Sequence, residues 1–261
     1  MGRLALLVLA GLFVTATVFP WCSQAARLRL KSSWAIALLD SLGVEVEADL
    51  THVTPGALVV ANHVSWIDIY VINAALPSAF VAKAEIRHWP VIGWLAAKND
   101  TIFLRRGSRG HARIINEEIG DILATGQHVA IFPEGTTTDG RSLLHFHAAL
   151  LQPALTAGRP VLPVAISYWE VDGERSMAPR YDGDISLGQC MQAIIRRKRL
   201  IARLVTTPLR GLNGEDRRQV AAEAREAIAL GARLPLATPE SELPTANASM
   251  SAHKLGLVGA N

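Results

Sequence analysis

Apolar residues run almost without interruption through the first part of the chain. The 23 residues between Arg3 and Arg27 carry no charge. As a single helix with a rise of about 1.5 Å per residue, this segment would be about 34 Å long, which is enough to cross a bilayer. The pattern predicts a membrane anchor helix over residues 1–26.

Two other interpretations of this segment stay open. The small residues of positions 23–26 are similar to the cleavage region of a secretory signal peptide, and an apolar helix can also lie flat in the membrane interface. The basic residues Arg27, Arg29 and Lys31 directly after the segment favour a retained anchor. They also predict that the rest of the chain lies on the cytoplasmic side of the inner membrane.

Beyond residue 27, short apolar runs alternate with longer amphipathic stretches, a pattern typical of an α/β domain. The apolar runs predict strands at Val44–Glu47, Ala57–Ala61, Ala79–Ala82, Thr101–Leu104, His128–Phe132 and Val161–Ser167. The amphipathic stretches predict helices at Trp66–Ala75, Pro90–Ala97, Ser108–Ala124, Leu143–Ala157, Gln189–Thr206 and Glu215–Leu230. We expect one α/β domain over residues 27–235, with a mixed sheet flanked by helices, and a mobile tail over residues 236–261.

Composition narrows the class of protein. Half of the residues are hydrophobic and 19% are charged, which excludes a disordered chain. The net charge of +3 is too small to predict nucleic-acid binding, and it fits an anionic lipid surface or a phosphorylated substrate better. Cys22 and Cys190 are too few for a disulfide framework. His145 and His147 have no third ligand at metal-binding spacing, so we predict no metal site.

The segment Asn62–Asp68 follows an apolar strand, a position where α/β proteins build sites. On one regular helix His63 and Asp68 would lie about 140° apart and could not share a face. If His63 instead lies in the loop before the helix, with Ser65 as N-cap, its imidazole can turn back toward the Asp68 carboxylate. Such a pair can act as a general base. The same residues also fit an ordinary helix start, with an aspartate favoured by the helix dipole.

The segment Phe132-Pro133-Glu134-Gly135-Thr136-Thr137 follows another apolar strand. Glu134 stands between a stiff residue and a permissive one, so we expect its carboxylate to be presented at the end of the strand rather than buried. The glycine and threonines after it offer N–H and hydroxyl groups to a ligand. Taken alone, the segment also fits a simple Pro-Glu-Gly turn.

Together these segments resemble the glycerolipid acyltransferase family, which includes bacterial lysophosphatidate acyltransferases. The resemblance covers roughly Leu58–Tyr168, and four blocks match in order and spacing: Asn62–Asp68, with its His-x-x-x-x-Asp pattern, Phe103–Arg106, Phe132–Thr136 and Val161–Val164. The resemblance implies that residues 27–235 form an acyltransferase catalytic domain.

The resemblance also implies roles for single residues. His63 and Asp68 match the catalytic dyad, and Arg106 matches the arginine that engages the phosphate of the acceptor. The remaining implied substrate contacts are Lys83, Phe103, Arg105, Glu134, Gly135, Thr136 and Pro163, of which the proline is linked to acyl-donor or structural roles. One departure is Asp100, which stands where the family pattern has glycine.

The chemistry of a thioester explains why a base is sufficient. The thiolate that leaves has a parent thiol with a pKa of about 8.5, by analogy with cysteine, so it needs little acid assistance. The acceptor hydroxyl, in contrast, must lose its proton before it can attack, and His63 can take that proton. The resemblance thus implies acyl transfer from acyl-CoA or acyl carrier protein to the hydroxyl of a lysolipid, without a cofactor.

Alternatives remain for the acceptor and for the reaction. Lysophosphatidate is the first candidate acceptor, and a lyso-ornithine lipid is the second. A lipid hydrolase that uses the same dyad on water, or a membrane-binding protein without catalysis, are more distant alternatives. In each case the expected partners are membrane lipids, with acyl-CoA or acyl carrier protein for a transferase, and not nucleic acid.

Overall fold

The computed structural model describes residues 2–104, 109–209 and 216–235. Arg105, Arg106 and the predicted mobile tail over residues 236–261 lie outside these ranges. Within them, seven strands form one sheet in the order β1-β7-β6-β2-β5-β3-β4. The strands are β1 (Val44–Asp49), β2 (Leu58–Ala61), β3 (Ser78–Lys83), β4 (Ile102–Leu104), β5 (His128–Ile131), β6 (Val161–Trp169) and β7 (Leu200–Thr206).

The sheet is mixed, as the sequence predicts. Strand β7 runs antiparallel to β6, and every other neighbouring pair of these seven strands is parallel. Strand β2 in the middle of the sheet is apolar and buried throughout, and its neighbour β5 is apolar and buried after its first residue, His128, which is typical of parallel strands covered on both faces.

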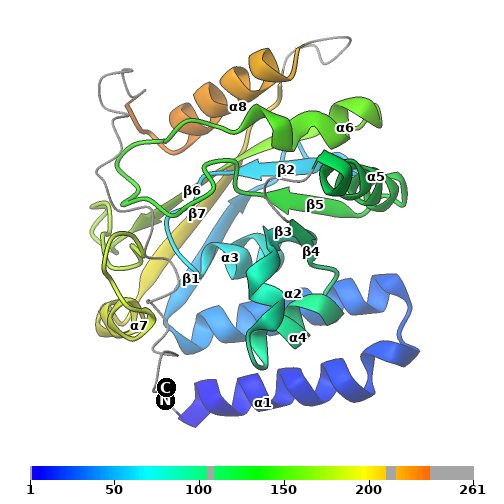
Figure 1. Cartoon of the computed structure of the whole chain (residues 1–261). Helices are drawn as coiled ribbons and strands as arrows, with labels where there is room; N and C mark the ends of the chain where they lie inside the picture. The colour runs from blue at the N-terminus through cyan, green and yellow to red at the C-terminus, as the bar shows by residue number, and fades with distance from the viewer. Residues whose placement is uncertain (1, 105–108, 210–215, 236–261) are drawn as a thin grey trace, which may run out of the picture.

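Helices cover both faces of the sheet (Figure 1). The helices are α1 (Gly2–Thr17), α2 (Gln24–Ser41), α3 (Asp68–Ala75), α4 (Ile92–Lys98), α5 (Arg109–Ala124), α6 (Gln152–Thr156), α7 (Leu187–Arg196) and α8 (Arg217–Gly231), with short 3₁₀ helices at Phe19–Trp21, Ala84–His88 and Ala148–Leu151. Helices α2, α3 and α7 share one hydrophobic core with the sheet, and α5, α6 and α8 share the other.

The predicted spanning helix over residues 1–26 is wrong. Helix α1 ends at Thr17 and has 16 residues, which is about 24 Å and too short for a bilayer core. Pro20 lacks an N–H and interrupts the helical bonding, and α2 starts anew with Ser23 as N-cap. Within the described ranges, no helix has the length and apolar character needed to cross a membrane.

The predicted helix over Gln189–Thr206 is wrong in its second half. Helix α7 ends at Arg196, Lys198 has a left-handed φ of 60°, and Leu200–Thr206 form strand β7. Buried and partly exposed residues alternate along β7, which is the period of a strand. The predicted helix over Leu143–Ala157 is also shorter, because only Ala148–Thr156 are helical.

Candidate active site

The carboxyl ends of β2 and β5 bring the two candidate segments together. These strands are parallel neighbours, with Val60 opposite Ile131. The loop after β2 carries His63 and the loop after β5 carries Glu134, and functional residues of α/β proteins gather at such ends. The two motifs, separated by 71 positions, therefore form one site.

His63 lies in the loop, and its imidazole turns back toward the start of α3. The Nδ1 atom of His63 lies 2.9 Å from Oδ2 of Asp68, which is the first residue of that helix. Because a carboxylate only accepts hydrogen bonds, the neutral imidazole that makes this contact carries its proton on Nδ1 and has its lone pair on Nε2. The Asp68 side chain is completely buried and that of His63 is 19% exposed. The pair thus has the arrangement of a base that a substrate can reach and a carboxylate that orients it.

The helix start differs from the expected one. Helix α3 begins at Asp68 rather than at Trp66, and Ser65 is not its N-cap. Instead the Oδ2 atom of Asp68 accepts the backbone N–H groups of Val64 (2.7 Å) and Ser65 (2.8 Å). One carboxylate oxygen therefore holds both the imidazole and the turn that precedes the helix.

Glu134 lies inside the protein, so the expectation of a presented carboxylate is wrong. Its Oε1 atom accepts the N–H of His63 (2.8 Å), its Oε2 atom accepts the N–H of Leu144 (2.9 Å), and the residue is only 4% exposed. Burial raises the pKa of Glu134 to about 7, although the two N–H donors act in the opposite direction. The N–H groups of His63 and Leu144 replace water at the two carboxylate oxygens, which lowers the cost of burying the side chain. The buried carboxyl group of Glu134 thus fixes the backbone at His63 through this N–H bond.

Two further residues of the second loop contact His63, and neither was among the predicted site residues, although Phe132 belongs to the segment quoted from the sequence. The ring of Phe132 is stacked on the imidazole, with centroids 3.9 Å apart and an interplanar angle of 11°. The N–H of Thr138 donates to the carbonyl of His63 (2.8 Å). An aromatic residue directly before Pro-Glu-Gly was the visible indication for Phe132, whereas nothing in the sequence distinguished Thr138.

Gly135 and Thr136 form the turn after Glu134. Gly135 has a φ of 71°, in the region that favours glycine, and its N–H donates to the carbonyl of Phe132 (3.1 Å). The side chain of Thr136 is exposed. The left-handed turn after Glu134 therefore explains the glycine at position 135. Thr136 is accessible to a ligand.

The residues implied in phosphate binding are only partly described. Strands β3 and β4 run parallel, with Lys83 opposite Leu104 at their carboxyl ends. Lys83 is exposed, while Phe103 is buried beneath the Arg87 guanidinium, which lies 5.4 Å from its ring centroid. The predicted phosphate contacts Arg105 and Arg106 follow β4 and lie outside the described residues.

Pro163 lies within the sheet and not beside the His63 loop. It is buried in β6 opposite Val60, and its carbonyl accepts the N–H of Thr207 (3.1 Å). Strand β7 pairs with β6 only from Val164 onward, so the missing N–H of the proline interrupts no bond between these two strands. The position of Pro163 favours a structural role.

Asp100, the departure from the family pattern, lies at the opposite end of the sheet. It precedes β4 and has a φ of 60°, a conformation that glycine adopts freely and aspartate tolerates. Its carboxylate lies 3.7 Å from the ammonium of the buried Lys31. Asp100 therefore has a structural partner, away from the His63 loop.

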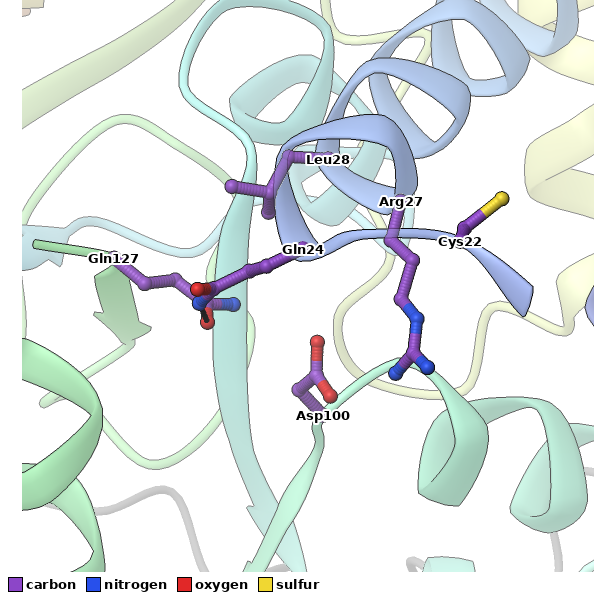
Figure 2. Close-up of a pocket in the computed structure, with 6 residues that line it drawn as sticks. All are labelled: Cys22, Gln24, Arg27, Leu28, Asp100 and Gln127. Carbon is purple, nitrogen blue, oxygen red and sulfur yellow. Dashed lines mark hydrogen bonds between the residues drawn. The ribbon is translucent and has the colours of Figure 1, made fainter. Parts of the chain in front are cut away.

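A cavity of about 310 Å³ lies at that same end (Figure 2). It is lined by Cys22, Gln24, Arg27, Leu28, Asp100 and Gln127. Gln24 and Gln127 meet in it through a side-chain hydrogen bond of 2.7 Å. None of the predicted site residues lines this cavity. In the part of the chain that the structure describes, no group of three or more His, Cys, Asp or Glu residues has an arrangement suited to a metal ion.

Comparisons with known proteins agree with this architecture. Residues 43–167 match the family model described as Acyltransferase. A lyso-ornithine lipid O-acyltransferase from Pseudomonas aeruginosa is 42% identical over 207 residues, which cover 78% of each chain. A 1-acyl-sn-glycerol-3-phosphate acyltransferase from Neisseria gonorrhoeae is 43% identical over 166 residues, which cover 64% of each chain.

A solved structure has the same fold. The crystal structure of the 1-acyl-sn-glycerophosphate (LPA) acyltransferase PlsC from Thermotoga maritima superimposes with a TM-score of 0.52 at 22% identity, and the match covers 88% of this chain and 95% of that one. The family resemblance inferred from the four sequence blocks is confirmed. The chain belongs to the acyltransferase family and is an enzyme of that family.

Proposed function

We propose that the protein transfers a fatty acyl chain from acyl-CoA or acyl carrier protein to the free hydroxyl of a lysolipid. The observation that carries this proposal is the contact of 2.9 Å between His63 Nδ1 and Asp68 Oδ2, on an imidazole that remains partly exposed. The relatives named as lysolipid acyltransferases support the class of acceptor.

In the proposed reaction, Nε2 of His63 removes the proton from the acceptor hydroxyl. The oxygen attacks the thioester carbonyl, the C–S bond breaks, and the departing thiolate takes up the proton from the imidazolium. Asp68 stabilises the imidazolium while it exists. The reaction needs no resident cofactor or metal, because the thioester supplies an activated acyl group.

1-Acyl-sn-glycerol-3-phosphate is the first candidate acceptor, because Lys83 at the carboxyl end of β3 and the adjacent pair Arg105 and Arg106 in the sequence would suit its phosphate. A lyso-ornithine lipid is the second, and it is favoured by the relative from Pseudomonas aeruginosa, whose match covers more of the chain. Substrate contacts for Gly135 and Thr136 belong to the same proposal.

The acceptor is identified by offering the purified protein a panel of lysolipids with each thioester donor and analysing the products by mass spectrometry. Acylated 1-acyl-sn-glycerol-3-phosphate supports the first candidate, and acylated lyso-ornithine lipid supports the second. Release of free fatty acid without an acylated lipid contradicts the transferase proposal and indicates a hydrolase. A His63→Ala variant serves as the blank.

We also propose that helix α1 lies flat in the interface of the inner membrane, with the sheet on the cytoplasmic side. One face of α1 packs on α2, where the Trp34 indole donates to the carbonyl of Leu7 (2.8 Å). The other face is apolar although it is exposed: Leu6, Leu9 and Phe13 are each more than 60% exposed. An apolar face of this kind favours an interfacial helix, and a lipid acceptor could then stay in its leaflet.

Helix α4 extends the same surface. It contacts α1 and exposes Ile92 and Trp94, and Trp21 in the turn after α1 is 89% exposed. Tryptophan is enriched at the level of lipid headgroups. We call Leu6, Leu9, Phe13, Trp21, Ile92 and Trp94 the apolar surface of α1 and α4.

A further inference from the structure

Strand β6 runs past the end of its neighbour β2. The register pairs Leu58–Ala61 with Val161–Val164, and β6 continues to Trp169. Beyond Ala61, the side chain of Asn62 replaces the missing backbone partner. Its Nδ2 donates to the carbonyl of Ile166 (3.0 Å), and its Oδ1 accepts the N–H of Ile166 (2.8 Å). The end of β6 is thereby fixed beside the loop that carries His63.

This extension places Tyr168 against Asp68. Side chains alternate between the faces of a strand, so Ile166 and Tyr168 point to the same side, and both belong to the core that α3 covers. Tyr168 is 2% exposed, and its hydroxyl donates to the Oδ1 atom of Asp68 at 2.5 Å. Within the described residues, this is the hydrogen bond that Oδ1 makes.

The Asp68 carboxylate is consequently held at both oxygens. Oδ2 accepts from His63, Val64 and Ser65, and Oδ1 accepts from Tyr168. All four partners are donors, and bonds at both oxygens prevent the rotation of the carboxylate. Burial, together with the negative charge of Asp68, raises the pKa of the Tyr168 phenol well above its usual value, so the phenol stays a donor.

We propose that Tyr168 is a positioning residue for the reaction: it fixes the plane of the Asp68 carboxylate and, by sharing its charge, limits how strongly Asp68 favours a protonated His63. The inference rests on the proposed function, in which neutral His63 is the base. A base that took up a proton too readily would be blocked at working pH, and the phenol opposes this.

Other titratable groups face the dyad and must be separated from this effect. Glu134 approaches from the loop after β5 and titrates near pH 7. Cys190 approaches from α7, where its Sγ lies 4.0 Å from Oγ of Ser65, and burial raises the pKa of its thiol. The thiol stays neutral at working pH, so Glu134 is the group that requires a control.

The test is the pH profile of kcat/KM for Tyr168→Phe. Without the phenol, Asp68 loses a hydrogen-bond donor that shares its negative charge, so protonation of the His63–Asp68 pair becomes more favourable. The acid limb is therefore expected to move to higher pH. The expected shift is about one pH unit, because a hydrogen bond to a charged group corresponds to about that much. The same shift is expected in a Glu134→Gln background. An unchanged acid limb in both backgrounds overturns the proposal.

Tyr70→Phe is the matched control. Tyr70 lies on α3 and packs its ring against Trp34 and Trp66, and the four donors to Asp68 do not include it. Removal of its hydroxyl is expected to leave the acid limb in place. A shift of equal size in Tyr70→Phe would mean that the profile reports general loosening of the core, and it would overturn the proposal.

Two further measurements keep the test decisive. The first is the titration of the His63 imidazole, followed by NMR without substrate and assigned with His63→Gln. In Tyr168→Phe the midpoint of this titration is expected to move in the same direction as the acid limb. An unchanged midpoint contradicts the proposal, even if no substrate is known. If the midpoint moves in a protein that acylates none of the lysolipids, the proposed function alone is contradicted.

The second measurement serves if Tyr168→Phe does not fold. Fluorotyrosine is incorporated into the Tyr70→Phe, Tyr181→Phe variant, in which Tyr168 is the one tyrosine left to label. The fluorinated phenol is a stronger hydrogen-bond donor to Asp68, so the His63 titration is expected to shift to lower pH. A shift to higher pH contradicts the proposal.

Discussion

His63 is held through its main chain as well as through its ring. Its N–H donates to Glu134 and its carbonyl accepts from Thr138, while its ring is stacked on Phe132 and contacts Asp68 through Nδ1. The orientation of the imidazole therefore does not depend on bound substrate, which is the preorganisation that a general base needs.

Replacement of His63 by alanine tests whether this orientation serves catalysis. His63→Ala is expected to lower kcat by about 10² to 10⁴, the usual contribution of a general base. The fold should persist, because the Glu134 and Thr138 bonds use only the main chain of residue 63. Steady-state kinetics with a thioester donor and circular dichroism measure the two effects. Turnover at the wild-type rate would leave the dyad without a catalytic role.

Glu134 gives a prediction about the pH dependence of stability. Its pKa is raised from 4.5 to about 7 by burial, so between these values the folded chain keeps a proton that the unfolded chain has lost. The corresponding stability is fully present below pH 4.5 and is lost as pH rises through 7, with a total of about 3 kcal/mol. Urea unfolding of the wild type and of Glu134→Gln between pH 4.5 and 8 measures this loss as a difference in slope. Parallel stability curves would contradict the raised pKa.

At the scale of elements, the link between α4 and β4 explains how the chain tolerates Asp100. The buried Lys31 on α2 donates to the carbonyls of Ser78 (3.2 Å) and Asn99 (3.1 Å) and lies near the Asp100 carboxylate. Burial lowers the pKa of Lys31, and Asp100 acts in the opposite direction. One ammonium thus fastens α2 to the beginnings of β3 and β4.

The backbone at Asp100 can be tested separately from its charge. Asp100→Gly and Asp100→Ala both remove the carboxylate near Lys31, but only alanine retains a Cβ at a φ of 60°. Asp100→Ala is therefore expected to be the less stable variant by about 1 kcal/mol. Denaturant unfolding of the two proteins gives the difference. Equal stability would show that the left-handed conformation is not retained.

Some elements were predictable from the sequence because their patterns are local. The apolar runs gave six of the seven strands within a few residues, and the break of the first helix had visible causes in Pro20 and Ser23. Strand β7 was missed because the basic run Arg196–Arg199 before it obscures the change from a helical to a strand period.

Individual contacts between site residues were predictable only where the partners are close in sequence. His63 and Asp68 are five positions apart, and the structure brings them together; their catalytic role stays a prediction. Tyr168 is 100 positions from Asp68, and no spacing rule connects them. Glu134 was expected to face outward because the sequence shows only its neighbours Pro133 and Gly135. It does not show that the N–H groups of His63 and Leu144 bind the carboxylate.

At the scale of the whole molecule, the apolar surface of α1 and α4 lies on one side, and α5, α6 and α8 cover the other face of the sheet (Figure 1). A protein with this asymmetry can sit on a membrane in one orientation, with α1 toward the lipid. Because these side chains are exposed, polar replacements there should leave the core intact.

Binding to vesicles tests this orientation. The triple variant Leu6→Ser, Phe13→Ser, Trp21→Ser removes side chains that are 70%, 66% and 89% exposed. Its partition onto vesicles of phosphatidylethanolamine and phosphatidylglycerol is expected to fall at least tenfold, since each buried apolar side chain contributes about 1.5–3 kcal/mol. Sedimentation with the vesicles measures the loss.

The control for this experiment uses the opposite face. Ile114→Ser and Leu230→Ser remove exposed apolar side chains from α5 and α8, and vesicle binding is expected to stay at the wild-type value. If these substitutions reduce vesicle binding as much as the triple variant does, binding has no defined orientation.

The bonds that fix the dyad also connect its geometry to how the chain folds. They join residues 71, 75, 100 and 104 positions apart, through Glu134, Thr138, Tyr168 and Asn62. Closing such long loops is slow compared with forming a helix. A newly made chain that has only its local helices therefore lacks the bonds that orient the imidazole, and the site is complete only after β2, β5 and β6 have assembled.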